Sequence, residues 1–135
     1  MLTRLLTRNR MKVLHSEVFL RRARFYAFHG VLPQERKVGG EFEVSTRVHY
    51  NICQASETDE VGSTLNYAEL YELVRAQMSL PSQLLEHVAG RIAKTILDTW
   101  KEADAVDVEL VKLNPPMGAD CDGAGVTLHA ERGCS

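Results

Sequence analysis

One helical face runs through LLEHVAGRIAKTILDTW, residues 84–100. Its apolar residues recur at three- and four-residue steps over about four turns, which is the spacing of an amphipathic α-helix. The stripe consists of Leu85, Val88, Ala89, Ile92, Ala93, Ile96, Leu97 and Trp100. Ser82, just before this stretch, is the expected N-cap. We therefore expect a helix that buries its stripe against another layer of the protein.

A second helix is predicted immediately before it. Asn66 followed by Glu69 has the spacing of a capping box, and Pro81 stops the element that they begin. The residues that share one helical face are Tyr67, Leu70, Tyr71, Val74 and Met78. Two amphipathic helices in succession need an apolar layer to cover.

Strand patterns precede the helices. In residues 41–52 the side chains alternate as in a strand with one buried face. The buried side consists of Phe42, Val44, Thr46, Val48, Tyr50 and Ile52. Residues 16–28 predict an earlier strand. Its predicted faces are Val18 and Leu20 on one side, and Phe19, Ala23 and Phe25 on the other. Residues 29–40 predict a loop that ends in a Gly-Gly turn.

Two further strands follow the helices. One buries Val106, Val108 and Leu110, and the other buries Val126, Leu128 and Ala130. The element order is β-β-α-α-β-β, without the alternating β-α-β units of a parallel sheet. We expect an α+β fold in which an antiparallel sheet carries two helices on one face. Its unpaired strand edges favour association into an oligomer.

Composition limits the function classes. With 135 residues, the chain is long enough for one domain with its own core. A content of 44% hydrophobic and 25% charged residues is typical of a soluble globular protein, and the net charge of −2 gives no reason to expect nucleic acid as a partner. Cys53, Cys121 and Cys134 form no C-x-x-C pair. Neither a disulfide framework nor a thiolate zinc site is predicted, which fits a reducing cytoplasm.

The N-terminal sequence, MLTRLLTRNRMK, is basic, and the first acidic residue is Glu17. It lacks the uninterrupted apolar core of a secretory signal. We expect residues 1–15 to be a poorly ordered leader and residues 16–135 to form the domain. No stretch of the sequence is apolar for long enough to cross a membrane.

Several site types lack their sequence motif. The five histidines, His15, His29, His49, His87 and His129, show no H-x-H, H-x-x-x-H or H-E-x-x-H spacing. Spacing therefore predicts no metal site, and a metal site would need the fold to bring distant residues together. The motifs of dinucleotide-binding, P-loop and serine-hydrolase proteins are absent too.

Lys112 ends an apolar run, VELVKLNPPMG at residues 108–118. It shares strand parity with the buried positions of that strand, so its side chain is predicted on the buried face. Partial desolvation there would make Lys112 a usable acid or base near neutrality. The segment from Asn114 to Pro116 restricts the backbone just beyond it. The alternative is an ordinary solvated charge at a strand end.

Three other residues are candidates for chemistry. Glu86 lies in the first turn of the helix at 84–100, where the helix dipole favours a carboxylate by about 0.3–1 kcal/mol. That structural role is one explanation; a functional Glu86 would offer two acceptor oxygens to a planar, guanidine-like edge. Tyr67 and Glu35 are further proton-handling groups. Spacing does not show whether these side chains converge with Lys112.

Four strings together resemble the dihydroneopterin aldolase family: RFYAFHGVLPQE, LNYAELYELV, LLEHVAGRIA and VKLNPPMGADCDGAGVTL. The likeness covers residues 16 to about 131, in the family's order. It implies the tunnelling fold, in which small subunits join their sheets into a ring, commonly as a tetramer or an octamer of two stacked rings. It also implies active sites between subunits and cleavage of 7,8-dihydroneopterin without a metal or organic cofactor. Epimerisation of the side chain often accompanies that cleavage.

The resemblance also assigns roles to individual residues. Glu86 matches the glutamate that anchors the pterin's amino-pyrimidinone edge, and Leu85 matches the adjoining pocket residue. Lys112 matches the family's acid/base lysine, and Glu35 matches a glutamate of the substrate pocket. Tyr67 matches the tyrosine that a neighbouring subunit contributes to proton transfer.

Two departures keep alternatives open. The common family string after the lysine is Lys-Pro-x-Ala-Pro, whereas this chain has Lys-Leu-Asn-Pro-Pro. Many members have Gly-Gln where this chain has Gly40-Glu41. They leave the balance of aldolase against epimerase open, so a dihydroneopterin triphosphate epimerase remains an alternative. A non-catalytic pterin-binding ring protein is a separate alternative. A pyruvoyltetrahydropterin synthase-like enzyme would need a histidine zinc triad that spacing does not provide.

Overall fold

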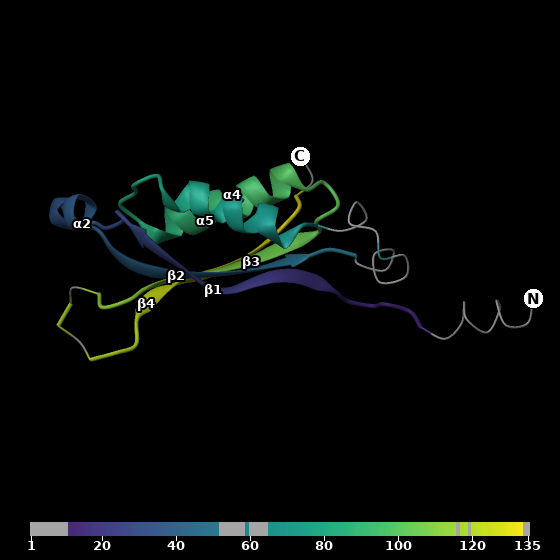
Figure 1. Ribbon diagram of the computed structural model, residues 1–135, viewed down its shortest axis with the longest axis horizontal. Helices are drawn as coiled ribbons and strands as arrows, with labels where there is room; N and C mark the ends of the chain where they lie inside the picture. The colour runs from purple at the N-terminus through teal and green to yellow at the C-terminus, as the bar shows by residue number, and fades with distance from the viewer. Residues whose placement is uncertain (1–10, 52–58, 60–64, 116, 119, 134–135) are drawn as a thin grey trace, which may run out of the picture.

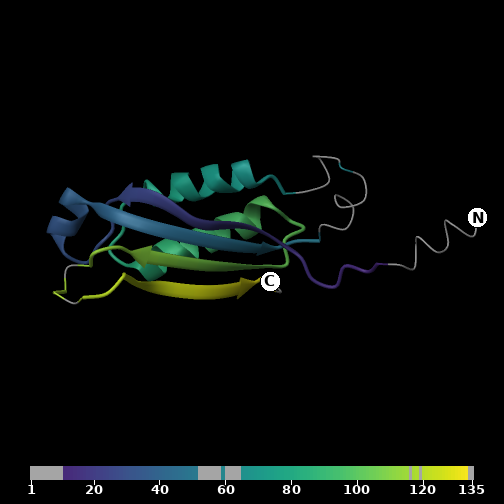
Figure 2. The same cartoon turned by 60° about the horizontal axis from the view of Figure 1, so that its bottom comes forward.

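The computed structural model describes residues 11–51, 59, 65–115, 117–118 and 120–133. Its centre is an antiparallel sheet with the strand order β1-β2-β3-β4. The strands are β1 (Glu17–Ala27), β2 (Gly40–His49), β3 (Ala105–Lys112) and β4 (Ala124–Glu131). Two helices, α4 (Tyr67–Met78) and α5 (Leu85–Thr99), cover one face of the sheet (Figure 1), and Figure 2 shows the helix-free face. The predicted α+β order is confirmed. No described helix is long and apolar enough to span a membrane.

A short third helix, α2 (Pro33–Val38), joins β1 to β2 at one end of the molecule (Figure 1). The prediction that residues 29–40 form only a loop is therefore wrong. Pro33 opens the helix, where its fixed φ is favourable and its missing N–H is not needed. The backbone N–H of Leu32 donates to Glu35 Oε1 at 3.1 Å, which satisfies one donor at the helix start.

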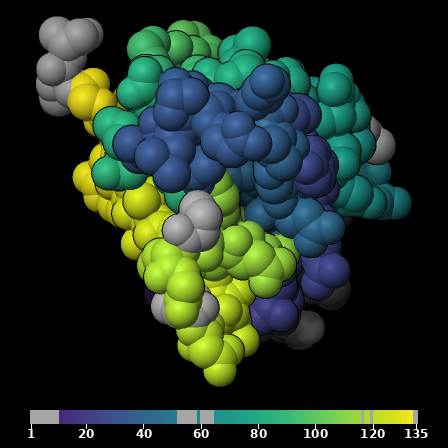
Figure 3. All heavy atoms as spheres, turned by 90° about the vertical axis from the view of Figure 1, so that its left-hand side faces the viewer, coloured from purple at the N-terminus to yellow at the C-terminus, as the bar shows by residue number. Residues whose placement is uncertain are grey.

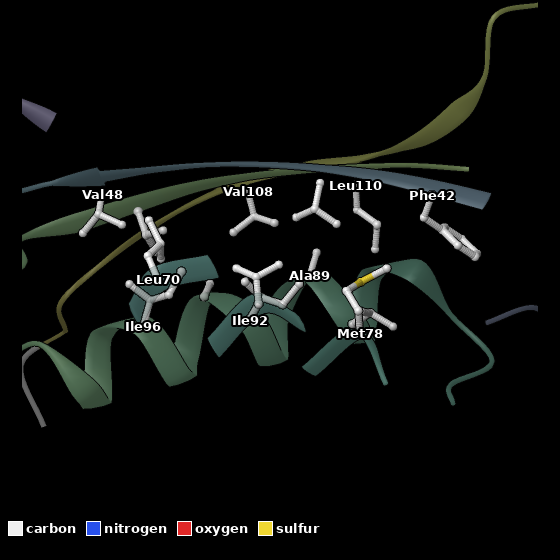
Figure 4. Close-up of a cluster of buried hydrophobic side chains, with 14 of the residues drawn as sticks. Phe42, Val48, Leu70, Met78, Ala89, Ile92, Ile96, Val108 and Leu110 are labelled. Carbon is white, nitrogen blue, oxygen red and sulfur yellow. The ribbon is translucent and has the colours of Figure 1, made fainter. Parts of the chain in front are cut away.

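The core lies between the sheet and the helices (Figure 4). The predicted stripes of β2, β3 and α5 meet there, because Phe42, Val108 and Ile92 are each at most 1% exposed. Burying a side chain of this size contributes about 1.5–3 kcal/mol. On α4 only Leu70, Val74 and Met78 of the predicted stripe are buried.

A β-bulge in β1 changes which of its residues face the core. The register with β2 shifts between Leu20 and Ala23, so the parity of every later residue in the strand is reversed. Phe25 therefore packs against the core on the same side as Val18, whereas Phe19 is 46% exposed. The predicted division of β1 into two faces is wrong beyond Leu20 for this reason.

The two long helices begin differently. Asn66 Oδ1 accepts a hydrogen bond from the Ala68 N–H at 2.8 Å, so the predicted cap of α4 is confirmed. The predicted cap of α5 is wrong: Leu84 occupies the N-cap position and supplies no side-chain acceptor. Ser82 is instead engaged with the segment after β1, where its carbonyl accepts from the Gly30 N–H at 2.9 Å. This bridge fixes the start of α5 beside the end of β1.

Candidate active site

Lys112 is the last residue of β3 and lies beside Phe42 of β2. Its Nζ donates to Glu35 Oε2 at 2.5 Å and to the backbone carbonyl of His29 at 3.2 Å. The side chains of Lys112 and Glu35 are only 13% and 16% exposed. The ammonium group also lies 5.4 Å from the centroid of the Phe42 ring. Lys112 is therefore enclosed, as its strand parity predicts, and is not a solvated strand end.

Helix α2 positions Glu35 for this contact. The hydrogen bond from Lys112, followed by that from the Leu32 backbone, holds the pKa of the Glu35 carboxyl below its ordinary value. Glu35 is therefore ionised near neutrality. Gly30 is needed beneath it, because a Cβ at that position would come within 2.4 Å of Glu35 Cβ. Arg36 Nη1 secures the same turn by donating to the carbonyl of Gly30 at 2.8 Å.

His29 is a buried histidine behind the ion pair. The residue is 1% exposed, and its ring lies edge-on to Phe42 at 5.3 Å between centroids. Neither ring nitrogen has a hydrogen bond of normal geometry within the described residues, although the nearby Met78 backbone favours the protonated ring slightly. Burial first, and then the charge of Arg91, lowers the pKa of His29 to about 4. The imidazole beside Lys112 is therefore neutral.

A pocket of about 440 Å³ opens beside the ion pair, which is a volume suited to a small organic molecule. It is lined by Tyr26, Gln34, Glu35, Val38, Gly39, Gly40, Glu41, Lys112, Leu113 and Asn114. Figure 3 looks onto this end of the molecule, with α2 in blue above the yellow-green segment that follows β3. Tyr26 Oη donates to the Val38 carbonyl at 2.7 Å, which fixes one wall.

Leu85 and Glu86 lie at the same end of the molecule but do not line this pocket. The bridge between His29 and Ser82 holds the first turn of α5 there. Leu85 packs against the core, whereas Glu86 is exposed and its carboxylate has no hydrogen bond or ion pair with another described residue. The His87 N–H already donates to the Leu84 carbonyl at 3.1 Å, but the N–H groups of Leu85 and Glu86 have no backbone acceptor among the described residues. The start of α5 therefore presents donors and a carboxylate together.

Tyr67 is far from the other candidates within one chain. Helix α4 runs from Leu70, which lies near Val48, to Met78, which lies near Phe42 (Figure 4). Because Phe42 pairs with Lys112, the start of α4 is at the opposite end of the sheet from the lysine. Tyr67 is 69% exposed there. The structure therefore brings Lys112 and Glu35 together, sets Leu85 and Glu86 nearby, and leaves Tyr67 apart.

Sequence analysis missed His29 and Tyr26 as parts of this site. Tyr26 lies in β1 beyond the bulge and His29 follows the strand, where parity counted from Val18 no longer holds, and the sequence patterns assign neither residue to a face. The histidine was tested only against metal spacings, which it does not satisfy. The sequence feature that singles out His29 is its position directly before Gly30, at the end of the predicted strand.

Comparisons with known proteins agree with this geometry. The family model for dihydroneopterin aldolase matches residues 18–129. The dihydroneopterin aldolase of Staphylococcus epidermidis is 36% identical over 115 residues, which cover 84% of this chain and 95% of that protein.

Two solved structures share the fold. The E. coli dihydroneopterin aldolase in complex with neopterin has a TM-score of 0.79 at 22% identity, covering 85% of this chain and 98% of that one. A Burkholderia dihydroneopterin aldolase bound to guanine has a TM-score of 0.72 at 18% identity, covering 88% and 93%. At such identities these two likenesses establish the tunnelling fold alone.

Proposed function

The chain belongs to the dihydroneopterin aldolase family and is an aldolase, hence a lyase; from this premise we propose how its own residues cleave 7,8-dihydroneopterin. The products are 6-hydroxymethyl-7,8-dihydropterin and glycolaldehyde. The observation that carries the proposal is the enclosed contact between Lys112 and Glu35 at the edge of a pocket of about 440 Å³.

The substrate supplies its own electron sink. A dihydropterin contains a C=N bond beside the side chain, so the electron pair of the broken carbon–carbon bond moves into the ring system. A second proton-handling group, for which Tyr67 of a neighbouring subunit is the candidate, takes the proton of the side-chain hydroxyl, which becomes the aldehyde of glycolaldehyde. Protonation of the remaining carbon then gives the hydroxymethyl product. No Schiff base with a lysine is required.

Lys112 is the proposed acid/base group. Its ammonium protonates the ring nitrogen, directly or through a water molecule, as charge arrives there. The ionised Glu35 holds the ammonium at the edge of the pocket by a charge-assisted hydrogen bond. Burial of both side chains keeps this interaction from being screened by solvent. Glu35 also faces the substrate pocket.

The start of α5 is the proposed anchor for the pterin ring. An amino-pyrimidinone edge presents N–H donors next to a carbonyl acceptor. The Glu86 carboxylate accepts hydrogen bonds from the N–H donors of the pterin. The backbone N–H groups at Leu85 and Glu86 donate to the pterin carbonyl. The neopterin and guanine bound by the two solved relatives both contain such an edge, which supports this assignment.

Tyr67 completes the site only if another subunit supplies it. Within one chain it lies at the opposite end of the sheet from Lys112, and β1 and β4 are edge strands of the described sheet. We therefore propose a homo-oligomeric ring, a tetramer or an octamer, with active sites between subunits. A light-scattering mass equal to one chain at assay concentration would contradict the ring. The proposed compartment is the cytoplasm, on the basis of the cysteine content.

Glycolaldehyde release from 7,8-dihydroneopterin tests the activity. Purified protein should release it with dihydropterin in equal amounts, without added metal. Parallel incubation with dihydroneopterin triphosphate distinguishes an epimerase, which would convert that substrate instead. Tight pterin binding without release of glycolaldehyde would contradict the aldolase and indicate a non-catalytic binding protein.

A further inference from the structure

Three neighbouring strands each present a metal-ligating side chain on the helix-free face of the sheet. They are His49 of β2, Asp107 of β3 and His129 of β4. Asp107 pairs directly with His129 of β4 on one side and with Arg47 of β2 on the other. His49 lies two residues beyond Arg47 on β2, so its side chain is on the same face of the sheet. Asp107 Oδ2 lies 2.7 Å from His49 Nε2, and Oδ1 lies 2.8 Å from His129 Nδ1. One carboxylate thus holds two imidazoles from the strands on either side of it.

The donor atoms of this trio all lie within 4.8 Å of one another. Donors bound to one zinc ion sit about 2.0–2.2 Å from it, so the three need only small side-chain movements to surround a common ion. Two imidazoles and a carboxylate suit zinc and the neighbouring divalent transition metals. His129 also has an outer partner, because Glu131 Oε1 lies 3.3 Å from its Nε2. A metal-bound imidazole characteristically donates its second N–H to such a carboxylate.

We propose that His49, Asp107 and His129 form a binding site for one divalent transition-metal ion, with zinc as the best-fitting example. The ion displaces the protons that Asp107 shares with the two imidazoles. The face is open to solvent, so water takes the fourth position. His49 also belongs to a neighbouring group with His15 and Glu17, whose donor atoms lie within 4.8 Å of one another. Arg47, the cross-strand neighbour of Asp107 on β2, is paired with Glu17, with Nε and Oε1 3.2 Å apart.

This site is separate from the Lys112 pocket. It lies on the other face of the sheet and toward its other end, where His49 pairs with Ala105. Its ligands are 58 and 22 residues apart in the sequence, which is why no spacing motif predicts it. A metal here has no part in the proposed cleavage.

Titration of the full chain with ZnCl₂ after treatment with EDTA tests the proposal. Isothermal calorimetry should give one ion per chain, and the thermal midpoint of unfolding should rise as zinc is added. The visible absorption spectrum of the Co²⁺-loaded chain should have the d–d bands of nitrogen and oxygen ligation and no thiolate charge-transfer band. Glu131→Gln, which removes the outer partner of His129, should weaken zinc binding about 10–100-fold. His49→Ala and His129→Ala, which remove ligands, should each weaken it at least as much.

Glu109→Gln is the matched control, because Glu109 is an exposed carboxylate on the same face of β3 but outside the trio. It should bind zinc as the unaltered chain does. His129 is nearly half exposed, so its variant is expected to fold even if the His49 variant does not. Absence of binding to the unaltered chain would overturn the proposal. Unchanged affinity in folded His129→Ala, or a thiolate spectrum with Co²⁺, would overturn it as well.

Discussion

The two ionic clusters of the sheet differ in their surroundings more than in their chemistry. Lys112 and Glu35 are enclosed at one end on the helix side, whereas Asp107 and His129 are 36% and 47% exposed on the helix-free face. Enclosure strengthens electrostatic interactions, because little water is present to screen them. The enclosed pair is therefore suited to stabilising charge on an organic substrate. The trio, of which His49 is 21% exposed, is the more open cluster and is suited to a ligand that it contacts directly, such as a metal ion.

The comparison is tested most severely by Lys112→Ala. Loss of the enclosed ammonium should lower turnover about 10²–10⁴-fold, the usual worth of a positioned acid or base, while pterin binding survives. Single-turnover kinetics measures this. Lys94→Ala is the control, because Lys94 is an exposed lysine on α5 paired with Asp98. Near-normal turnover in a folded Lys112→Ala protein would return the lysine to a structural role.

The buried end should also be the acid-sensitive end. His29 has a pKa of about 4 in the folded protein and an ordinary value of 6.5. Between these values the unfolded chain binds a proton that the folded chain does not, so stability is lost as the pH falls. The loss between pH 7 and pH 4 should approach about 3 kcal/mol. Urea unfolding at fixed protein concentration across this range measures it.

His29→Leu should remove most of this pH dependence, because leucine does not titrate. An equally steep loss of stability in the variant would assign the effect to other groups. Glu35 changes the stability in the same direction at lower pH. Its pKa is lowered in the folded protein, so its stabilising contribution is present above the pKa of the unfolded chain and is lost as the pH falls through the pKa of the folded protein.

Glu86→Gln separates anchoring from chemistry. Glutamine replaces one charged acceptor with a donor that faces the pterin's own donor, so binding should weaken by about 1–3 kcal/mol. Fluorescence titration with a pterin measures the affinity. Glu72→Gln, on the exposed surface of α4, is the control and should bind as the unaltered chain does. Equal affinities for the two variants would refute the anchoring role.

The smallest effect is expected on the open face. Arg47 Nε lies 3.2 Å from Glu17, but the arginine side chain is 59% exposed. Arg47→Gln should change the free energy of unfolding by only about 0–1 kcal/mol, and added salt should reduce even that. Urea unfolding at low and high ionic strength measures it. A salt-insensitive loss of several kcal/mol would mean that the open face is buried in the assembled protein.

Local periodicity in the sequence determined the elements and their order. The alternation from Phe42 to Val48 and the helical stripe from Val88 to Ile96 each depend on neighbours a few residues apart, so they can be recognised without tertiary information. The same reasoning put Lys112 on the buried face, because parity along β3 is uninterrupted. It failed in β1, where an added residue before Ala23 reversed the parity.

Convergence of side chains was decided only by the tertiary structure. Lys112 meets Glu35 across 77 residues of sequence and the His29 carbonyl across 83. His49 and His129 reach Asp107 only because three strands pair in one register. Such meetings depend on the register between strands and on where the bulge and the bridge at Ser82 fix the chain. The strand register and these fixed points result from packing of the whole core, so they cannot be predicted from a short segment of the sequence.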